Sequence, residues 1–246
     1  MSELSPFSIP HEVLRLMMRS CFDHTVSVFW GEPDGEPEMH SASGVLVDLD
    51  RPILVTAEHV IDEFLKKQTG NPSIRLQIAE GSIENVAERI IGRANRPDLV
   101  TLDLTGLDLK GFAKHLSLYT PSKWPPHSVI PGLTVLIIGF PMAYRSLLPI
   151  QRAIKFDSFN LKTQVSSVNE HGFICAVETN SIRNLSSDAA WPETYSGISG
   201  CPIFAIRGTP SVLDLVGIVY EASSNWNIIH AHHANLVSPG GTLSNP

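Results

Sequence analysis

Cysteine is scarce in this sequence. The 246 residues contain three cysteines, at positions 21, 175 and 201, and no CxxC pair. An odd number at wide spacing predicts no disulfide framework, and the missing CxxC pair argues against a structural zinc site. We therefore expect free thiols, no metal ion, no cofactor and a reducing, cytoplasmic setting.

Long apolar runs and an excess of positive charge are also missing. Leu133–Phe140 is among the longest apolar runs, well short of the roughly 20 residues that cross a bilayer. The 18 basic and 25 acidic residues give a net charge of −7, which argues against a general nucleic-acid binder. The N-terminus carries Glu3 and Glu12 and no continuous apolar stretch, unlike a secretory signal. We expect neither a membrane nor a nucleic-acid partner, and the oligomeric state stays open.

Short runs rich in valine, isoleucine, leucine and threonine are plentiful. They recur between residues 24 and 104 and again between 133 and 231, each bounded by Gly, Pro, Asp or Asn. Such regular spacing predicts an all-β sandwich or barrel. The segment Glu88–Ala94 is one of the expected strands.

Two segments have helical rather than alternating periodicity. Residues 9–20 place Leu14, Met17 and Met18 at helical spacing, which predicts a short helix packed on the core. His59–Lys67 is expected to form one or two helical turns.

A proline-rich stretch divides the chain in two. Residues 117–132 contain four prolines, which is typical of a linker. The last residues, VSPGGTLSNP, are expected to be a flexible tail. The expected organisation within one domain is an N-terminal helical extension at 1–22, an N-terminal barrel at 23–117, a linker at 118–132, a C-terminal barrel at 133–236 and the tail at 237–246.

Three segments hold chemically active residues in the order histidine, aspartate, serine. The segment LVTAEHV ends a predicted strand at His59, PDLVTLDL begins one at Asp98, and SGISGCPIF places Ser199 in a glycine-flanked loop. Acyl transfer needs a hydroxyl nucleophile, an imidazole that takes its proton near pH 7, and a carboxylate that fixes the imidazole tautomer. Backbone N–H groups beside the serine can stabilise the developing oxyanion.

These segments resemble the signatures of the chymotrypsin-like (trypsin-fold) serine peptidases. SASGVLVD followed by LVTAEHV is similar to the G-S-G-F/V strand and T-A-x-H of that family, PDLVTLDL to its D-L-A-hydrophobic-L, and SGISGCPIF to its G-x-S-G-G-P. VLIIGFP and LVGIV resemble two further strands of its disulfide-free bacterial members. Over residues 43 to 235, the resemblance implies an all-β fold of two six-stranded antiparallel barrels with the site between them.

The resemblance also implies a role for each site residue. His59 would be the general base, Asp98 its orienting partner and Ser199 the nucleophile, while the N–H groups of Gly197 and Ser199 would form the oxyanion hole. The implied activity is that of a serine endopeptidase, a hydrolase that cuts a protein or peptide substrate through an acyl-enzyme.

Two residues depart from the family pattern. Glu58 precedes His59, where alanine is common, and we expect its side chain to be exposed or to disturb the site electrostatically. Cys201 stands where the family has glycine, serine or alanine, and we expect it to be structural yet a source of sensitivity to thiol reagents. These departures motivate the alternative of an inactive pseudo-peptidase that binds a partner protein. An esterase using the same triad also stays open.

The residues that would select the substrate are predicted less sharply. Thr194, Ala222 and Ser223 would line the specificity pocket and the substrate-pairing strand. Glu193 lies six residues before Ser199, the offset of the acidic pocket base in relatives that cut after basic residues.

A histidine cluster near the C-terminus gives a competing indication. His230 would line the pocket, as a histidine of this region does in relatives that bind glutamate or glutamine side chains. His230 and His232 would share one face of a strand, as two metal ligands do, but the sequence fixes no third ligand.

Overall fold

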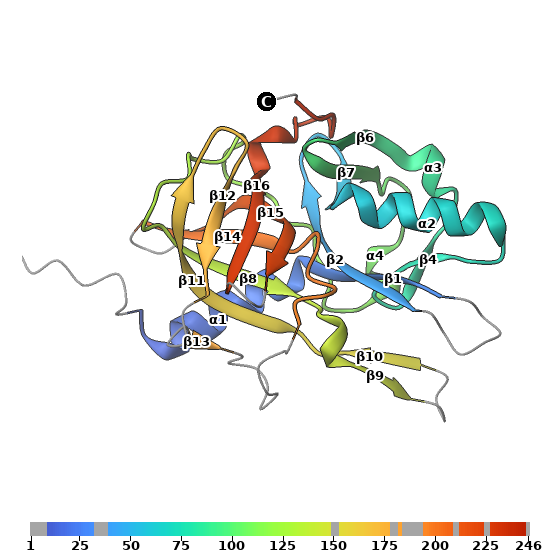
Figure 1. Cartoon of the computed structure of the whole chain (residues 1–246), viewed down its shortest axis with the longest axis horizontal. Helices are drawn as coiled ribbons and strands as arrows, with labels where there is room; N and C mark the ends of the chain where they lie inside the picture. The colour runs from blue at the N-terminus through green and yellow to red at the C-terminus, as the bar shows by residue number, and fades with distance from the viewer. Residues whose placement is uncertain are drawn as a thin grey trace, which may run out of the picture.

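Two β-sheets dominate the computed structural model (Figure 1). The structure describes residues 9–31, 39–148, 153–177, 182–183, 194–208, 212–223 and 227–244. Glu193 therefore lies outside the described residues. The all-β class expected from the sequence is confirmed, and few helices accompany the strands. None of the described helices is long and apolar enough to cross a membrane.

The N-terminal half is an antiparallel sheet of seven strands in the order β5-β4-β1-β2-β3-β7-β6. The strands are β1 (Thr25–Trp30), β2 (His40–Asp48), β3 (Pro52–Thr56), β4 (Leu76–Ile78), β5 (Gly81–Ile83), β6 (Ile90–Asn95) and β7 (Asp98–Asp103). Within the described residues the outer strands β5 and β6 do not pair with each other, so this half is an open half-barrel rather than a closed six-stranded barrel. Its core encloses the fully buried Leu46, Leu54 and Phe64.

The C-terminal half is a closed barrel of six strands. These are β8 (Thr134–Gly139), β11 (Phe159–Val168), β12 (Gly172–Ala176), β14 (Pro202–Arg207), β15 (Val212–Ser223) and β16 (Ile228–His233). The pairing of β11 with β12 closes the ring. The two-residue strand β13 (Ile182–Arg183) adds to β11, and β9 (Arg145–Leu148) forms a hairpin with β10 (Ala153–Phe156).

Strand β8 explains the apolar run seen in the sequence, because both of its faces are covered. Val135 and Ile137 face the barrel core. Leu136 and Ile138 belong to a second cluster that also contains Leu14 of the first helix. Burial on both sides removes the alternation that an antiparallel strand with one wet face shows.

Helices cover the sheets at a few places. They are α1 (His11–Asp23), α2 (Glu58–Gly70), α3 (Val86–Arg89), α4 (Leu109–Phe112) and the 3₁₀ helices η1 (Met142–Tyr144) and η2 (Ala234–Leu236). Helix α1 buries Leu14, Met17, Met18 and Cys21, and these residues share one cluster with residues of both halves. The α1 helix is therefore a strap between the halves.

The proline-rich segment is tied to both halves through Tyr119. Its backbone pairs with β2, where Tyr119 N–H donates to Leu46 O at 2.8 Å. Its hydroxyl donates to Leu213 O at 3.0 Å and accepts from Leu215 N–H at 3.2 Å. Tyr119 thus contacts both halves, one through its backbone and the other through its hydroxyl, where the chain passes from the first sheet to the second.

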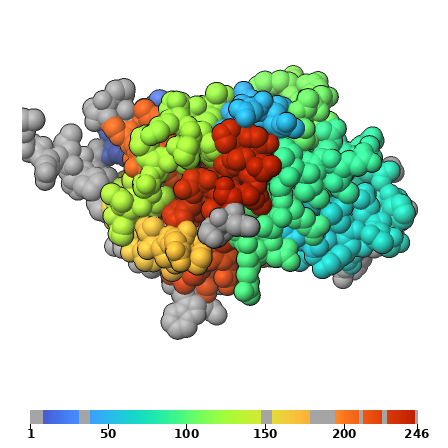
Figure 2. Space-filling view, turned by 90° about the horizontal axis from the view of Figure 1, so that it is seen from above, coloured from blue at the N-terminus to red at the C-terminus, as the bar shows by residue number. Residues whose placement is uncertain are grey.

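The C-terminal segment does not fray as the sequence led us to expect. Trp124 Nε1 donates to Val237 O at 2.8 Å, and Thr101 Oγ1 donates to Gly241 O at 2.5 Å. Val237 bridges Leu243 and is 2% exposed. The expectation of a flexible tail was wrong for residues 237–244, because glycine allows close backbone packing that composition alone does not reveal. In Figure 2 this segment, in red, lies against the green and blue surface of the N-terminal half.

Candidate active site

His59 lies in the helix that follows β3, and Asp98 begins the strand next to β3 in the N-terminal sheet. Strand β3 ends at Thr56 and α2 begins at Glu58, which places His59 in the first helical turn. Asp98 is the first residue of β7, the neighbour of β3. A first-turn N–H has no partner within its own helix, and here the N–H of His59 donates to Asp98 Oδ1 at 2.9 Å. This hydrogen bond therefore connects the first turn of α2 to the first residue of β7.

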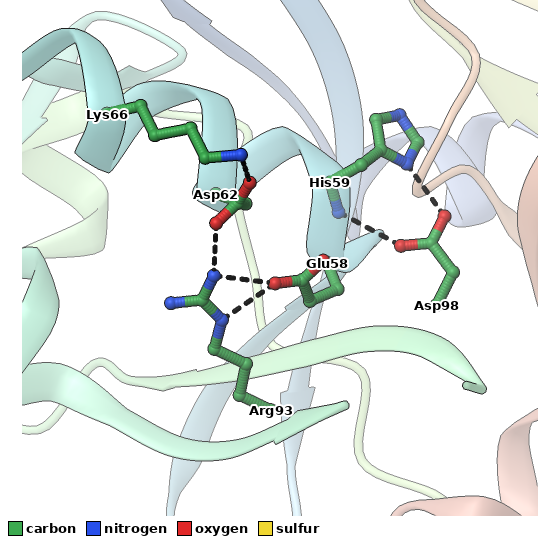
Figure 3. Close-up of polar contacts among 6 residues, drawn as sticks. All are labelled: Glu58, His59, Asp62, Lys66, Arg93 and Asp98. Atoms are coloured by element: carbon green, nitrogen blue, oxygen red, sulfur yellow. Dashed lines mark hydrogen bonds and ion pairs between the residues drawn. The ribbon is translucent and has the colours of Figure 1, made fainter. Parts of the chain in front are cut away.

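The imidazole of His59 is oriented by the same carboxylate. His59 Nδ1 lies 2.7 Å from Asp98 Oδ2 (Figure 3). Since a carboxylate accepts, Nδ1 carries the proton and Nε2 keeps its lone pair. The hydrogen bond to Asp98 raises the pKa of His59 above its ordinary 6.5, even though burial opposes this. Burial would raise the pKa of Asp98, but the hydrogen bonds from His59 outweigh it and lower that pKa.

His232 supports Asp98 from the other half of the molecule. The N–H of Asp98 donates to His232 Nε2 at 3.0 Å, and His232 Nδ1 donates to His171 O at 3.2 Å. The ring stacks on Tyr220 with centroids 4.1 Å apart. Strand alternation predicts that His232 shares a face with His230, but no local signal shows that this face meets Asp98, so sequence reasoning missed the contact.

Ser199 sits in a tight loop before β14. The flanking Gly197 and Gly200 have φ angles of +94° and +84°, which favour glycine. A Cβ on Gly200 would lie 2.0 Å from Ser43 O. Within the described residues, the N–H groups of Gly197 and Ser199 donate to no backbone carbonyl, so both are available to an external acceptor.

Ser43 joins this loop to the N-terminal sheet. Its N–H donates to Ser199 O at 2.8 Å. Its hydroxyl donates to Gly197 O at 3.0 Å and accepts from Phe140 N–H at 2.9 Å. Thr56 Oγ1 donates to Ser43 O at 2.7 Å. Ser43 was part of a strand motif in the sequence, but nothing there predicted its contact with the loop that carries Ser199.

His59 and Ser199 line one cavity of about 570 Å³ between the two halves. Gly197, His40 and Arg145 also line it. Asp98 is not among the lining residues, because it lies behind the imidazole. The structure thus brings the predicted base, nucleophile and oxyanion loop to one cavity, with the carboxylate supporting the base.

The predicted substrate-selecting residues lie apart from this cavity. Thr194 is exposed. Ala222 and Ser223 are half-buried in β15, where they pair with β16. His230 pairs with Glu221, and its ring centroid is 5.9 Å from that of Tyr220. None of them lines the cavity that holds His59 and Ser199, and their roles stay predictions.

The expectation that the side chain of Glu58 is exposed was wrong, whereas its charge does act on the site, because it contributes to raising the pKa of His59. The carboxylate of Glu58 is neither exposed nor unpaired: it is buried and accepts from Arg93 Nε at 2.7 Å. Cys201 is fully buried, and this burial raises the pKa of its thiol to about 12. Burial thus disfavours the reactive thiolate near neutral pH, in keeping with a structural role for Cys201, and its sensitivity to thiol reagents stays a prediction.

The possible histidine metal site gains no further ligand. Among the described residues, no three His, Cys, Asp or Glu side chains are placed to hold a metal ion. His232 has both ring nitrogens in hydrogen bonds, which leaves neither for a metal.

Comparisons with known proteins show similarity in structure alone. No family model matches the chain, and no curated protein matches it in sequence. The active form of the Rv3671c protease from M. tuberculosis matches with a TM-score of 0.50 at 12% identity, covering 95% of this chain and 90% of that one. The protease Anisep from Arthrobacter nicotinovorans gives a TM-score of 0.48 at 10% identity over 86% and 90% of the two chains. Taken with its two β-sheets, the first match shows that this chain has the trypsin-like serine protease fold.

Proposed function

We propose that this protein is a serine endopeptidase that uses His59, Asp98 and Ser199 as its catalytic triad. The observation that carries the proposal is the double hydrogen bond between His59 and Asp98, made beside a cavity that Ser199 also lines. An imidazole held in the Nδ1–H tautomer presents Nε2 as a base. The substrate is a protein or peptide.

The proposed reaction has two displacement steps. Ser199 Oγ attacks the scissile carbonyl carbon as its proton passes to His59 Nε2, and the oxyanion accepts from the N–H groups of Gly197 and Ser199. His59 then gives the proton to the leaving amine as the C–N bond breaks, which leaves an acyl-enzyme on Ser199. Water repeats the attack, with His59 again taking and returning the proton, and frees the carboxylate product.

An inactive protein-binding module is the second candidate function. The departures at Glu58 and Cys201 motivated it, but Glu58 is paired with Arg93 and contributes less to raising the pKa of His59 than Asp98 or Glu63 does. The polar contacts around Asp98 and Ser43 further favour the enzyme, because a binding surface does not require a preorganised imidazole.

Labelling with a fluorophosphonate probe tests the proposal. The wild-type protein should be labelled at pH 8, on the alkaline side of the ordinary histidine range, and Ser199→Ala should abolish labelling. Ser82→Ala changes an exposed serine of β5 and should label normally. Folded wild-type protein that resists the probe at this pH would favour the binding module.

Turnover of substrates then separates peptidase from esterase. A peptide library should yield amide-bond cleavage that depends on Ser199, whereas cleavage of activated esters alone would indicate the esterase. We place the enzyme in a reducing compartment, the cytoplasm, because its three cysteines are all free and buried.

A further inference from the structure

A cluster of charged side chains lies directly beside the His59–Asp98 pair (Figure 3). Arg93 of β6 donates through Nε to Glu58 Oε1 at 2.7 Å, and its Nη2 also lies 2.7 Å from that oxygen. The same Nη2 donates to Asp62 Oδ1 at 2.5 Å. We name these contacts of Arg93 with Glu58 and Asp62 the Arg93 clamp.

The clamp differs from an ordinary surface ion pair in its burial. The side chain of Glu58 is 6% exposed and that of Arg93 is 34% exposed. A buried carboxylate without a partner is strongly unfavourable, whereas surface pairs contribute little. Arginine also fixes direction, since its planar fork binds two carboxylates at set angles. Lys66, by contrast, is 73% exposed where it contacts Asp62. Glu58 is therefore the carboxylate whose pairing matters most for stability.

The clamp joins the two elements that carry the base and its partner. Arg93 pairs with Val100 in the β6–β7 hairpin, whose turn places Asp98 opposite Asn95. Glu58 and Asp62 lie on the first turns of α2, and His59 lies between them. The hairpin and the helix are thus connected twice, once through Asp98 and once through Arg93.

We infer that Arg93 is a positioning residue, which holds the first turn of α2 against the β6–β7 hairpin and so sets the geometry between His59 and Asp98. The inference rests on the proposed function for its catalytic consequence. Arg93 itself does not line the cavity of His59 and Ser199, so it acts through Glu58 and not on a substrate.

The expected consequence is a loss in kcat with little change in KM. Arg93→Met should lower kcat on the order of 10- to 100-fold, because small displacements of a catalytic group have effects of that size. KM should stay within about twofold, since the cavity lining is intact. Arg93→Lys keeps the charge but not the fork and should recover part of the rate.

Proton NMR tests the positioning directly and does not require turnover. The proton on His59 Nδ1 in its hydrogen bond to Asp98 should give a low-field resonance, which Asp98→Asn identifies by removing it. This resonance should shift or broaden in Arg93→Met. Arg51→Met is the matched control, because Arg51 forms an ion pair with Asp103 on the same sheet, at 3.3 Å, away from α2.

A second variant covers the case in which Arg93→Met does not fold. The double variant Glu58→Gln, Arg93→Met leaves no unpaired buried charge, and it should show the same loss of kcat and the same change in the resonance. An unaltered resonance and kcat in these variants would overturn the inference. Wild-type protein that shows the resonance but hydrolyses nothing would instead overturn the proposed function.

Discussion

At the scale of single residues, the contacts of His232 determine its charge. Its Nε2 accepts the N–H of Asp98, so that nitrogen carries no proton in the folded state, and its Nδ1–H is used by His171 O. Burial lowers its pKa below the ordinary 6.5, against smaller opposing contributions that include Asp98. His232 is therefore a neutral hydrogen-bonding group that helps to hold the backbone of Asp98 in place.

This charge state predicts a dependence of stability on pH. As pH falls through 6.5, the unfolded chain binds a proton at His232 that the folded chain does not bind, so the free energy of unfolding decreases. Above 6.5 neither state binds it, and the contribution vanishes. Urea unfolding at pH 7.5 and 5.5 should show a smaller decrease for His232→Leu and His232→Gln than for the wild type.

The two variants also separate the proton from the hydrogen bond. At pH 7.5, His232→Leu should lose about 1–3 kcal/mol, because it leaves the N–H of Asp98 without an acceptor. Glutamine offers an acceptor oxygen and should lose less. An equal pH dependence in all three proteins would contradict the assignment.

At the scale of elements, the loop that carries Ser199 depends on backbone geometry that favours glycine. Gly200 combines a φ of +84° with a neighbour on each side: its missing Cβ would lie 2.0 Å from Ser43 O and 2.2 Å from Thr56 Oγ1. The loop is thus packed against β2 and β3, and Ser199 takes its position from both halves of the molecule.

Gly200→Ala should therefore destabilise the fold by about 2–5 kcal/mol, the sum of backbone strain and overpacking. Gly106→Ala is the matched control, because Gly106 has a φ of +82° but no atom within 4 Å of the added Cβ. It should lose only about 1–2 kcal/mol of backbone strain. Chemical denaturation measures both, and equal losses would show that packing at Ser43 contributes nothing.

Elements also show what the sequence could and could not predict. β-branched composition and turn residues predicted most strands, because these signals are local. The expected strand at Glu88–Ala94 begins instead as helix α3, and β6 starts only at Ile90. Arg89 donates to the carbonyls of Glu84 and Asp103. The contact with Asp103 favours the helical turn, and the periodicity of the local sequence does not predict it.

The same difference between local signals and long-range contacts applies to the candidate active site. The histidine, aspartate and serine were predicted because each stands in a recognisable short motif. Ser43, His232 and Arg93 act through partners far away in the chain, at separations of 154, 134 and 35 residues. Such contacts depend on how the sheets pack, and a single sequence does not specify them.

At the scale of the whole molecule, each half is completed by a segment from the opposite end of the chain. Helix α1 packs with Leu136 and Phe204 of the C-terminal barrel, whereas residues 237–244 bind Thr101 of β7 and Asp50 in the turn between β2 and β3. The two halves are therefore connected by helix α1 and by residues 237–244, as well as by the site between them.

Deleting residues 237–246 should weaken the N-terminal half. The loss of the buried Val237 and of two side-chain hydrogen bonds is expected to remove about 3–5 kcal/mol, which lowers the unfolding temperature by roughly 10 °C. Calorimetry measures the temperature, and hydrogen exchange should show faster exchange in β6 and β7. An unchanged transition would mean that the segment contributes no stability.

The returning segment also has a consequence for biosynthesis. A ribosome makes the sheet that carries His59 and Asp98 well before residues 237–244, which pack against this sheet. When the strands of both sheets have been translated, the nascent chain still lacks Gly241, whose carbonyl accepts the hydrogen bond from Thr101. We therefore expect the N-terminal half to complete its packing only after residues 237–244 have been made.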